Sequence, residues 1–246
     1  ASLTVINAAM AHQLNEFKYS IDSLVSQGME QEEALYKVLK ESIIASKNIR
    51  FEGDGYSEEW REEAMKRGLT NVSHVPDAIM RFNDPQSRDV LIGENIFNEN
   101  ELTCRIEVEL EKFTKKVQIE SRVLGDLAIN HIIPTAVIYQ NRLLENLRGL
   151  REIFSPEEYE VLGADRRELI KEIQMRVLEI KQLVREMTEA RHVANRKTSQ
   201  VEKAYCYEET VCPYMEKIRE HIDILELEID DEIWPLPKYR ELLFTK

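Results

Sequence analysis

The stretch Glu168–Asn195, ELIKEIQMRVLEIKQLVREMTEARHVAN, decides the fold of this sequence. Its apolar residues recur at alternating three- and four-residue steps, which places them on one side of a helix. With Arg191 occupying one position, they are Ile170, Ile173, Val177, Ile180, Val184, Met187 and Ala194. A second run keeps the register with one polar member, Glu208: Val201, Ala204, Val211, Met215, Ile218, Ile222, Leu225 and Ile229. Only a few residues around Thr198 separate the runs, so we predict an antiparallel, heptad-patterned helical hairpin over residues 165–230.

Helical periodicity also extends through the rest of the chain. Residues 3–25 should form a helix that ends at Gly28, with an apolar stripe of Leu3, Ile6, Met10, Leu14, Phe17, Ile21 and Leu24. A second helix is expected over residues 30–46, with these residues facing inward: Ala34, Leu35, Val38, Leu39 and Ile43. A long helix should follow from about residue 99 to 154, kinked at Pro134 because proline removes a backbone donor.

These patterns indicate an all-α protein, a long-helix bundle with the hairpin as one part. Eight glycines and seven prolines are too few for the frequent turns of an all-β fold. We divide the chain into a helical segment, residues 1–94, with a glycine-containing loop at 48–57, and a long-helix bundle, residues 95–246. The bundle includes the hairpin and a proline-stiffened C-terminal tail at 234–246.

Charge and cysteine content limit the partners and the compartment. The chain has 33 basic and 46 acidic residues, a formal charge of -13, which repels phosphate backbones and anionic lipids. We therefore expect no nucleic acid and no membrane partner. The three cysteines form no CxxC pair and are not an even set, which disfavours a disulfide framework and favours a cytoplasmic protein.

The loop Asn48–Ser57, NIRFEGDGYS, is the one candidate for functional importance. Two glycines permit backbone angles closed to other residues and expose backbone amides, while flanking side chains supply charge. The residues concerned are Arg50, Glu52, Gly53, Asp54 and Gly55. The loop lacks the lysine of a phosphate-binding loop and the alternating carboxylates of a calcium loop. A structural turn is the favoured interpretation.

Other candidate sites have simpler explanations. Glu189 and His192 form an ExxH pair, but a di-metal bundle needs a second such pair, which is absent, so we favour a solvated helix face. His131 lies in an apolar stretch and is interpreted as a core or interface histidine. Cys206 and Cys212 have no nearby histidine in the register of a nucleophile. We assign no catalytic, cofactor-binding or metal-binding residue.

Three stretches together resemble the C-terminal part of type III glutamine synthetases. They are KNIRFEGDGYSEEW at 47–60, VQIESRVLGDLAINHIIP at 117–134 and WPLPKYRELLF at 234–244. The resemblance implies that the full-length protein ligates ammonia to glutamate with ATP, through γ-glutamyl phosphate, using Mg or Mn. It also implies a homo-oligomeric ring. No catalytic motif of that family occurs here, so we expect this chain alone to be inactive and to brace subunits.

The alternative is a stand-alone helical scaffold or interaction protein, and a helical-bundle metalloenzyme is the third possibility. A scaffold would share the hairpin. It would not explain residues 2–17, which resemble the helix that follows the family's last active-site strand. We therefore expect Ala1 to be a cut within a longer protein, with the upstream catalytic domain of the same polypeptide as partner. Apolar faces should then be exposed on this chain by itself.

Overall fold

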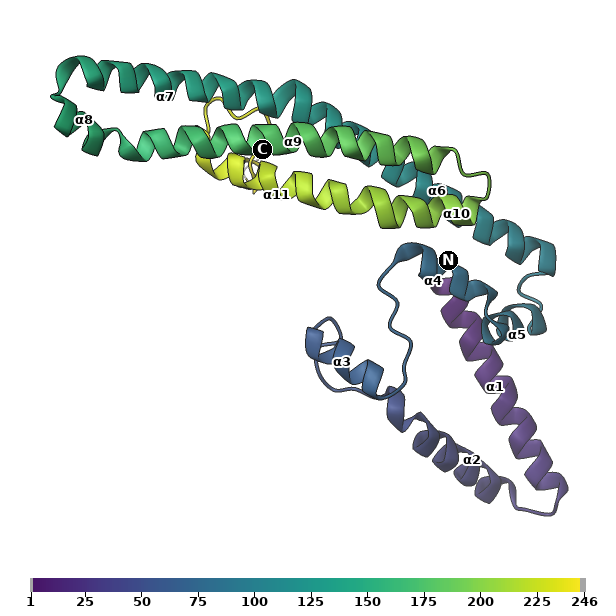
Figure 1. Ribbon diagram of the computed structural model, residues 1–246. Helices are drawn as coiled ribbons and strands as arrows, with labels where there is room; N and C mark the ends of the chain where they lie inside the picture. Colours follow the sequence, from purple (N-terminus) through teal and green to yellow (C-terminus); the bar gives the residue numbers. More distant parts are fainter. Residues whose placement is uncertain (1, 244–246) are drawn as a thin grey trace. The chain divides into compact units, whose positions relative to one another are not determined.

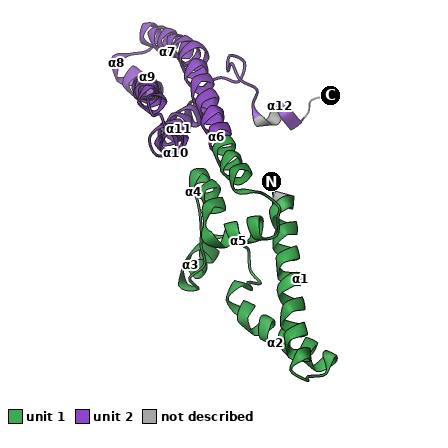
Figure 2. Ribbon diagram, turned by 90° about the vertical axis from the view of Figure 1, so that its right-hand side faces the viewer, with its two compact units in different colours: residues 1–109 green, residues 110–246 purple. Residues whose placement is uncertain are grey.

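The computed structural model describes residues 2–243, which are mainly helical and contain no strand. The all-α prediction is confirmed. The chain divides between Glu109 and Leu110 into two compact units (Figure 2), and each is described by itself. The division predicted at residues 94 and 95 stays a prediction, and the last three residues of the predicted tail, 244–246, lie outside the described residues. None of the described helices combines the length and hydropathy needed to cross a membrane.

Unit 1 begins with two longer helices that pack on each other (Figure 1). Its elements are α1 (Ser2–Ser26), α2 (Gln31–Ala45), the 3-10 turn η1 (Ser46–Ile49), α3 (Glu58–Lys66), α4 (Val75–Met80), the 3-10 turn η2 (Arg81–Asn83), α5 (Pro85–Gly93) and the start of α6 (Glu99–Leu127). Gly28 follows α1 with a φ of 96°, and Gly68 follows α3 with a φ of 71°. Both angles favour glycine, and the predicted end of the first helix at Gly28 is confirmed.

A polar clamp fastens α1 to the end of α5. Asn15 Nδ2 donates to Glu94 Oε2 over 2.8 Å, and His12 Nδ1 lies 3.0 Å from Glu94 Oε1. Both Glu94 oxygens therefore have partners on α1. The clamp sets the position of α5 against the middle of α1.

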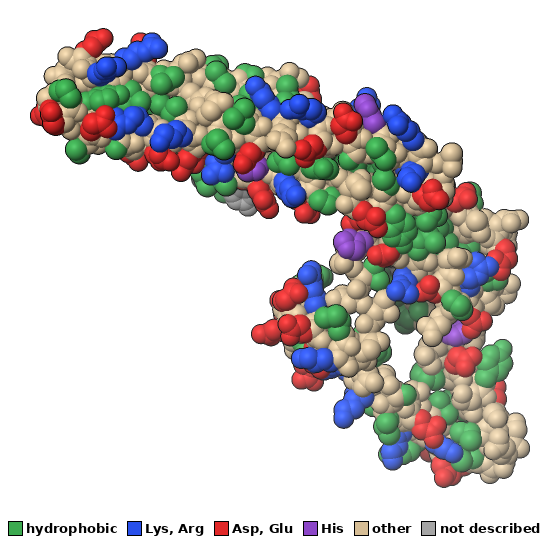
Figure 3. Space-filling model, in the orientation of Figure 1, with side chains coloured by type: hydrophobic (Ala, Val, Ile, Leu, Met, Phe, Trp, Pro, Cys, Tyr) green, Lys and Arg blue, Asp and Glu red, His purple; other side chains and the backbone are tan. Residues whose placement is uncertain are grey.

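The apolar core of unit 1 is thin and rich in alanine. In α1–α5 the buried apolar side chains are Ala8, Ala34, Val38, Ala64, Pro76 and Leu91. The prediction that Leu35, Leu39 and Ile43 face inward is wrong, because all three are exposed. The first half of the α1 stripe is exposed too, with Leu3 at 75%. Figure 3 shows hydrophobic side chains (green) on the surface of this unit.

Unit 2 consists of long helices laid side by side (Figure 1). After the remainder of α6 come the π turn η3 (Ala128–Ile132), α7 (Ile133–Ile153), α8 (Pro156–Leu162), α9 (Ala164–Asn195), α10 (Gln200–Cys206), the π turn η4 (Tyr207–Val211), α11 (Cys212–Glu228) and α12 (Tyr239–Leu243). A short connection at residues 196–199 follows α9, and the chain returns along it through α10 and α11. α9 also packs on α7.

Both π turns lie just before a proline. η3 ends two residues before Pro134, and η4 ends two residues before Pro213. Proline has no backbone donor and its ring pushes on the preceding turn, and one wider turn relieves both effects while the helix continues. The predicted long helix over residues 99–154 is thereby confirmed, with η3 at the position of the expected kink.

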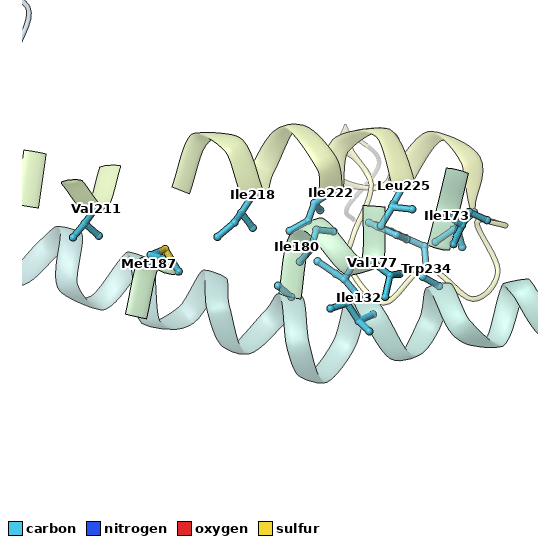
Figure 4. Packing of buried hydrophobic residues seen from close by; sticks show 14 of the residues in the cluster. Ile132, Ile173, Val177, Ile180, Met187, Val211, Ile218, Ile222, Leu225 and Trp234 are labelled. Carbon is cyan, nitrogen blue, oxygen red and sulfur yellow. The ribbon is translucent and has the colours of Figure 1, made fainter. Parts of the chain in front are cut away.

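The core of unit 2 is built mainly by α9 and α11 (Figure 4). The figure shows Ile173, Val177, Ile180 and Met187 beside Val211, Ile218, Ile222 and Leu225, with Ile132 and Trp234 in the same cluster. Each fully buried side chain of this size contributes roughly 1.5–3 kcal/mol. Whether the pairing follows a regular heptad repeat stays a prediction.

Tyr207 is the core residue that the apolar pattern missed. The predicted register placed Glu208 in the second run, but its neighbour Tyr207 is the residue that is fully buried there, together with Val211. Its hydroxyl donates to Asn195 Oδ1 over 2.8 Å, and Gln118 Nε2 donates to the same oxygen over 3.2 Å. Burial raises the pKa of the Tyr207 phenol, so this hydroxyl keeps its proton. Asn195 thus ties together α6, the end of α9 and η4.

Candidate functional site

The loop predicted at residues 48–57 leads from η1 into α3. Hydrogen bonds among its own residues hold its C-terminal half. The amide of Tyr56 donates to Asp54 Oδ1 over 2.9 Å, and the Ser57 hydroxyl donates to the Asp54 carbonyl over 2.9 Å. Ser57 Oγ in turn accepts from the Trp60 amide over 3.2 Å, which caps α3. Asp54 therefore shapes a tight turn rather than offering a free ligand.

Arg67, at the end of α3, fixes the other half of the loop. Its Nη1 donates to the Arg50 carbonyl over 2.7 Å, and its Nε pairs with Glu63 over 2.6 Å. The guanidinium lies 5.8 Å from the ring centre of Phe51 and 5.9 Å from that of Trp60. The two rings are 4.4 Å apart. One cation therefore joins the loop backbone to an aromatic pair.

The two glycines have different roles, and neither role is the predicted one. Among the described residues, positive φ angles occur at other glycines, not at Gly53 or Gly55. A Cβ at Gly53 would lie 2.7 Å from Cε1 of Phe51 and still closer to Cζ, whereas a Cβ at Gly55 would meet nothing within 4 Å. Gly53 is therefore needed so that the Phe51 ring can approach the backbone, and Gly55 is not constrained in this way.

A shallow hollow of about 540 Å³ lies at the base of the loop. Its lining residues are Lys47, Asn48, Arg50, Phe51, Glu52 and Arg67. Arg50 is turned back, since its Nη2 donates to the Ile43 carbonyl over 3.0 Å, and Arg67 is occupied as described above. Tyr56 does not line the hollow and is 96% exposed. The two arginines of the hollow thus hold the loop, and the Tyr56 phenol does not line it.

The other predicted candidates do not join this loop. Glu189 and His192 are both exposed on α9. His131 is exposed in η3, so it is not a core histidine, and its interpretation as an interface histidine stays a prediction. Its apolar neighbours Ile132 and Ile133 are buried, but the helix turns the imidazole to the other side.

The Cys212 thiol of unit 2 is unsuited to nucleophilic chemistry. Burial, reinforced by Glu208, raises the pKa of the Cys212 thiol to about 11, so the thiol is neutral at physiological pH. Cys206 Sγ lies 3.7 Å from the Thr210 hydroxyl. Within residues 2–243, no three His, Cys, Asp or Glu side chains come together as a metal site would require.

Two residues of the loop's support were missed by the sequence analysis. Trp60 and Arg67 are seven residues apart, which places them on one face two helical turns apart. That spacing was a usable signal. What the sequence did not indicate was that Arg67 would reach back to the carbonyl of Arg50, because this contact depends on the path of the loop.

This arrangement presents a side chain on a held loop. The loop's acidic groups shape a turn or face solvent, and the half-buried Arg67 guanidinium contacts backbone carbonyls and a carboxylate. What remains available is an aromatic residue on a stiff support. The geometry is that of a binding element.

Comparison with known proteins places this chain in a family. A model of the glutamine synthetase C-terminal domain matches residues 34–151, which include the loop. A glutamine synthetase of Bacteroides fragilis (strain YCH46) is 71% identical over all 246 residues, which make up 34% of that protein.

Two more distant relatives agree. A glutamine synthetase of Butyrivibrio fibrisolvens is 29% identical over 89% of this chain and 31% of its own length. A type-3 glutamine synthetase of Dictyostelium discoideum is 26% identical over 87% of this chain and 29% of its own length. The chain spans about a third of the length of the relatives it matches. It belongs to the glutamine synthetase family and contains the C-terminal domain of that family.

Proposed function

We propose that this chain is the helical, non-catalytic C-terminal part of a type III glutamine synthetase. The whole protein would ligate ammonia to glutamate with ATP, through γ-glutamyl phosphate, and this part would brace the catalytic part and the subunit assembly. The family match and the relatives support the identity of the whole protein.

The residues described here do not offer the ligand cluster that the divalent metals of that reaction would need. Glutamine synthesis with Mg or Mn needs converging oxygen or nitrogen ligands, and within residues 2–243 no three such side chains come together. No catalytic step is therefore assigned to this chain. Its proposed contribution is mechanical.

The observation that carries the proposal is the apolar stripe at the start of α1. Leu3, Ile6, Met10 and Leu14 are all exposed, and no charged side chain occurs before Glu16. An uncharged, exposed apolar helix face indicates a surface that another polypeptide covers. Since the relatives are about three times as long, the proposed cover is the upstream catalytic domain of the same protein.

One substitution, Met10→Lys, tests this in two settings. In the isolated chain Met10 is exposed, so the free energy of unfolding should change by less than about 0.5 kcal/mol. In the full-length protein the same lysine would be forced into an apolar contact, and ATP-dependent glutamine formation should fall at least tenfold together with loss of the native oligomer.

The control and the opposite outcomes are equally direct. Leu227→Lys places a lysine at an exposed leucine of unit 2 and is the matched control in both settings. Full activity and native assembly of the full-length Met10→Lys protein would contradict the proposed cover. Measurable glutamine formation by residues 1–246 alone would refute the non-catalytic assignment.

A further inference from the structure

Tyr56 is the most exposed large hydrophobic side chain among the described residues, at 96%. Its backbone is held tightly, since its amide donates to Asp54 and the next residue caps α3. A large aromatic side chain on a fixed backbone loses little conformational entropy when it binds, which is why tyrosine is frequent at interface centres. The loop therefore has the properties of a preformed anchor.

The loop is held at several points. Arg67 holds the carbonyl at its start, the Phe51 and Trp60 rings stack beneath it, and Gly53 allows the close approach of Phe51. None of these contacts involves the Tyr56 side chain. The support thus positions a residue that has no role in the packing of the unit.

The shape of the site indicates a macromolecular partner rather than a small ligand. Small molecules bind in concave pockets, and Tyr56 does not line the hollow at the base of the loop. A side chain that projects needs a partner that supplies the pocket. A phenol selects apolar walls with a hydrogen-bond acceptor at the far end.

The charges around Tyr56 indicate which charges the rim of the partner's pocket should carry. Glu52, Asp54 and Glu59 are exposed near the tip, whereas Arg50 is turned back toward α2 and Arg61 pairs with Glu58. The tip is therefore acidic. A complementary partner surface would carry lysine or arginine around the pocket.

We propose that Tyr56 docks into a basic-rimmed apolar pocket on the part of the glutamine synthetase polypeptide that lies outside these 246 residues. The inference rests on the proposed function, which supplies that polypeptide. About two thirds of the length of the relatives lies beyond the matched region. A partner on the same chain or in the same assembly is present at high effective concentration, which favours it over a freely diffusing protein.

The test places the photo-crosslinking residue p-benzoylphenylalanine at position 56 of the full-length protein. Irradiation should join position 56 to a peptide outside the 246 residues, identified by mass spectrometry. Adding Gly53→Ala should lower the cross-link yield severalfold, because the added Cβ collides with Phe51. Adding Gly55→Ala, where a Cβ meets nothing within 4 Å, should leave the yield unchanged.

Three results would overturn the inference: no cross-link, a cross-link only to residues 1–246 of this or another copy, or equal yields in the two glycine backgrounds. Tyr56→Ala and Tyr56→Phe in the full-length protein give a second readout. Alanine should lower the temperature at which the assembly dissociates, and phenylalanine should lower it less. Glutamine formation measured in parallel separates the two ideas, since an active enzyme without the cross-link refutes only the docking.

Discussion

The two units of this chain bury their apolar residues to very different extents, although both have helical apolar stripes. In unit 2 the stripes of α9 and α11 cover each other, and residues such as Ile180 and Ile218 are fully buried. In unit 1 half of the buried apolar residues of α1 to α5 are alanines, while Leu3 and Ile43 are exposed. An amphipathic pattern therefore predicts that one face of a helix is covered. It does not predict that the covering element lies in the same stretch of chain.

The largest effect should come from the same substitution made in both units. Ile180→Ala removes a fully buried side chain and should lower the free energy of unfolding by about 2–5 kcal/mol. Ile43→Ala, at a residue that is 56% exposed, should change it by less than about 0.5 kcal/mol. Urea unfolding of the isolated chain measures both values. Equal losses would show that unit 1 has a core of its own.

A second comparison is confined to the loop of unit 1. Gly53→Ala pushes a Cβ against the Phe51 ring and should cost about 1–3 kcal/mol of local stability, whereas Gly55→Ala should be nearly neutral. The chain has two tryptophans, so the indole NMR signal of Trp60 can be followed directly. It should shift in the first variant and stay unchanged in the second. The reverse pattern would mean that the aromatic pair does not support the loop.

Helix positions and most helix ends could be predicted from the sequence, because they depend on neighbours along the chain. The first helix, for example, ends as predicted before Gly28, which has a positive φ angle. The exposure of Leu35 and Ile43 could not be predicted, since periodicity says which residues share a face and not what lies opposite.

The position of the candidate site could be predicted, but the contacts that hold it together could not. The loop residues were identified, yet the reason for Gly53 is the Phe51 ring and not an unusual backbone angle. The role of Arg67 depends on a contact between residues 17 positions apart. The burial of Tyr207 in place of Glu208 follows from the wider turn before Pro213, which a regular heptad pattern does not contain.

Tyr207→Phe tests the hydrogen bond between η4 and the end of α9. The substitution keeps the ring in the core and removes the hydrogen bond to Asn195, which still accepts from Gln118. We expect a loss of about 0.5–1.5 kcal/mol in thermal or urea unfolding. Tyr36→Phe, at an exposed tyrosine of α2, is the control and should show no loss. A Tyr207→Phe chain as stable as the parent would show that the hydrogen bond from Tyr207 to Asn195 does not stabilise unit 2.

The smallest effect concerns pH and the other end of the α9–α11 pair. Burial raises the pKa of Glu228 above its usual value of 4.5, and Glu172 adds to this while Arg176 opposes it. The folded state therefore holds this proton more tightly than the unfolded chain. The stabilisation is complete below about pH 4.5 and is lost as pH rises through the raised pKa.

Glu228→Gln should remove that pH dependence and change stability at neutral pH by less than about 1 kcal/mol. Unfolding midpoints measured from pH 4 to 7 test this, with Glu220→Gln, at an exposed position of α11, as control. If the stability of the Glu228→Gln chain changed with pH as the parent's does, a group other than Glu228 would cause the pH dependence.

We propose that polypeptide outside these 246 residues covers the exposed apolar faces of unit 1, and amide hydrogen exchange tests this. We expect the amides of α1 and α2 to exchange rapidly in the isolated chain and to be protected at least a hundredfold in the full-length protein, because exchange follows local opening. The amides of α9 and α11 should be protected in both. Equal protection of α1 and α2 in the two proteins would contradict the account.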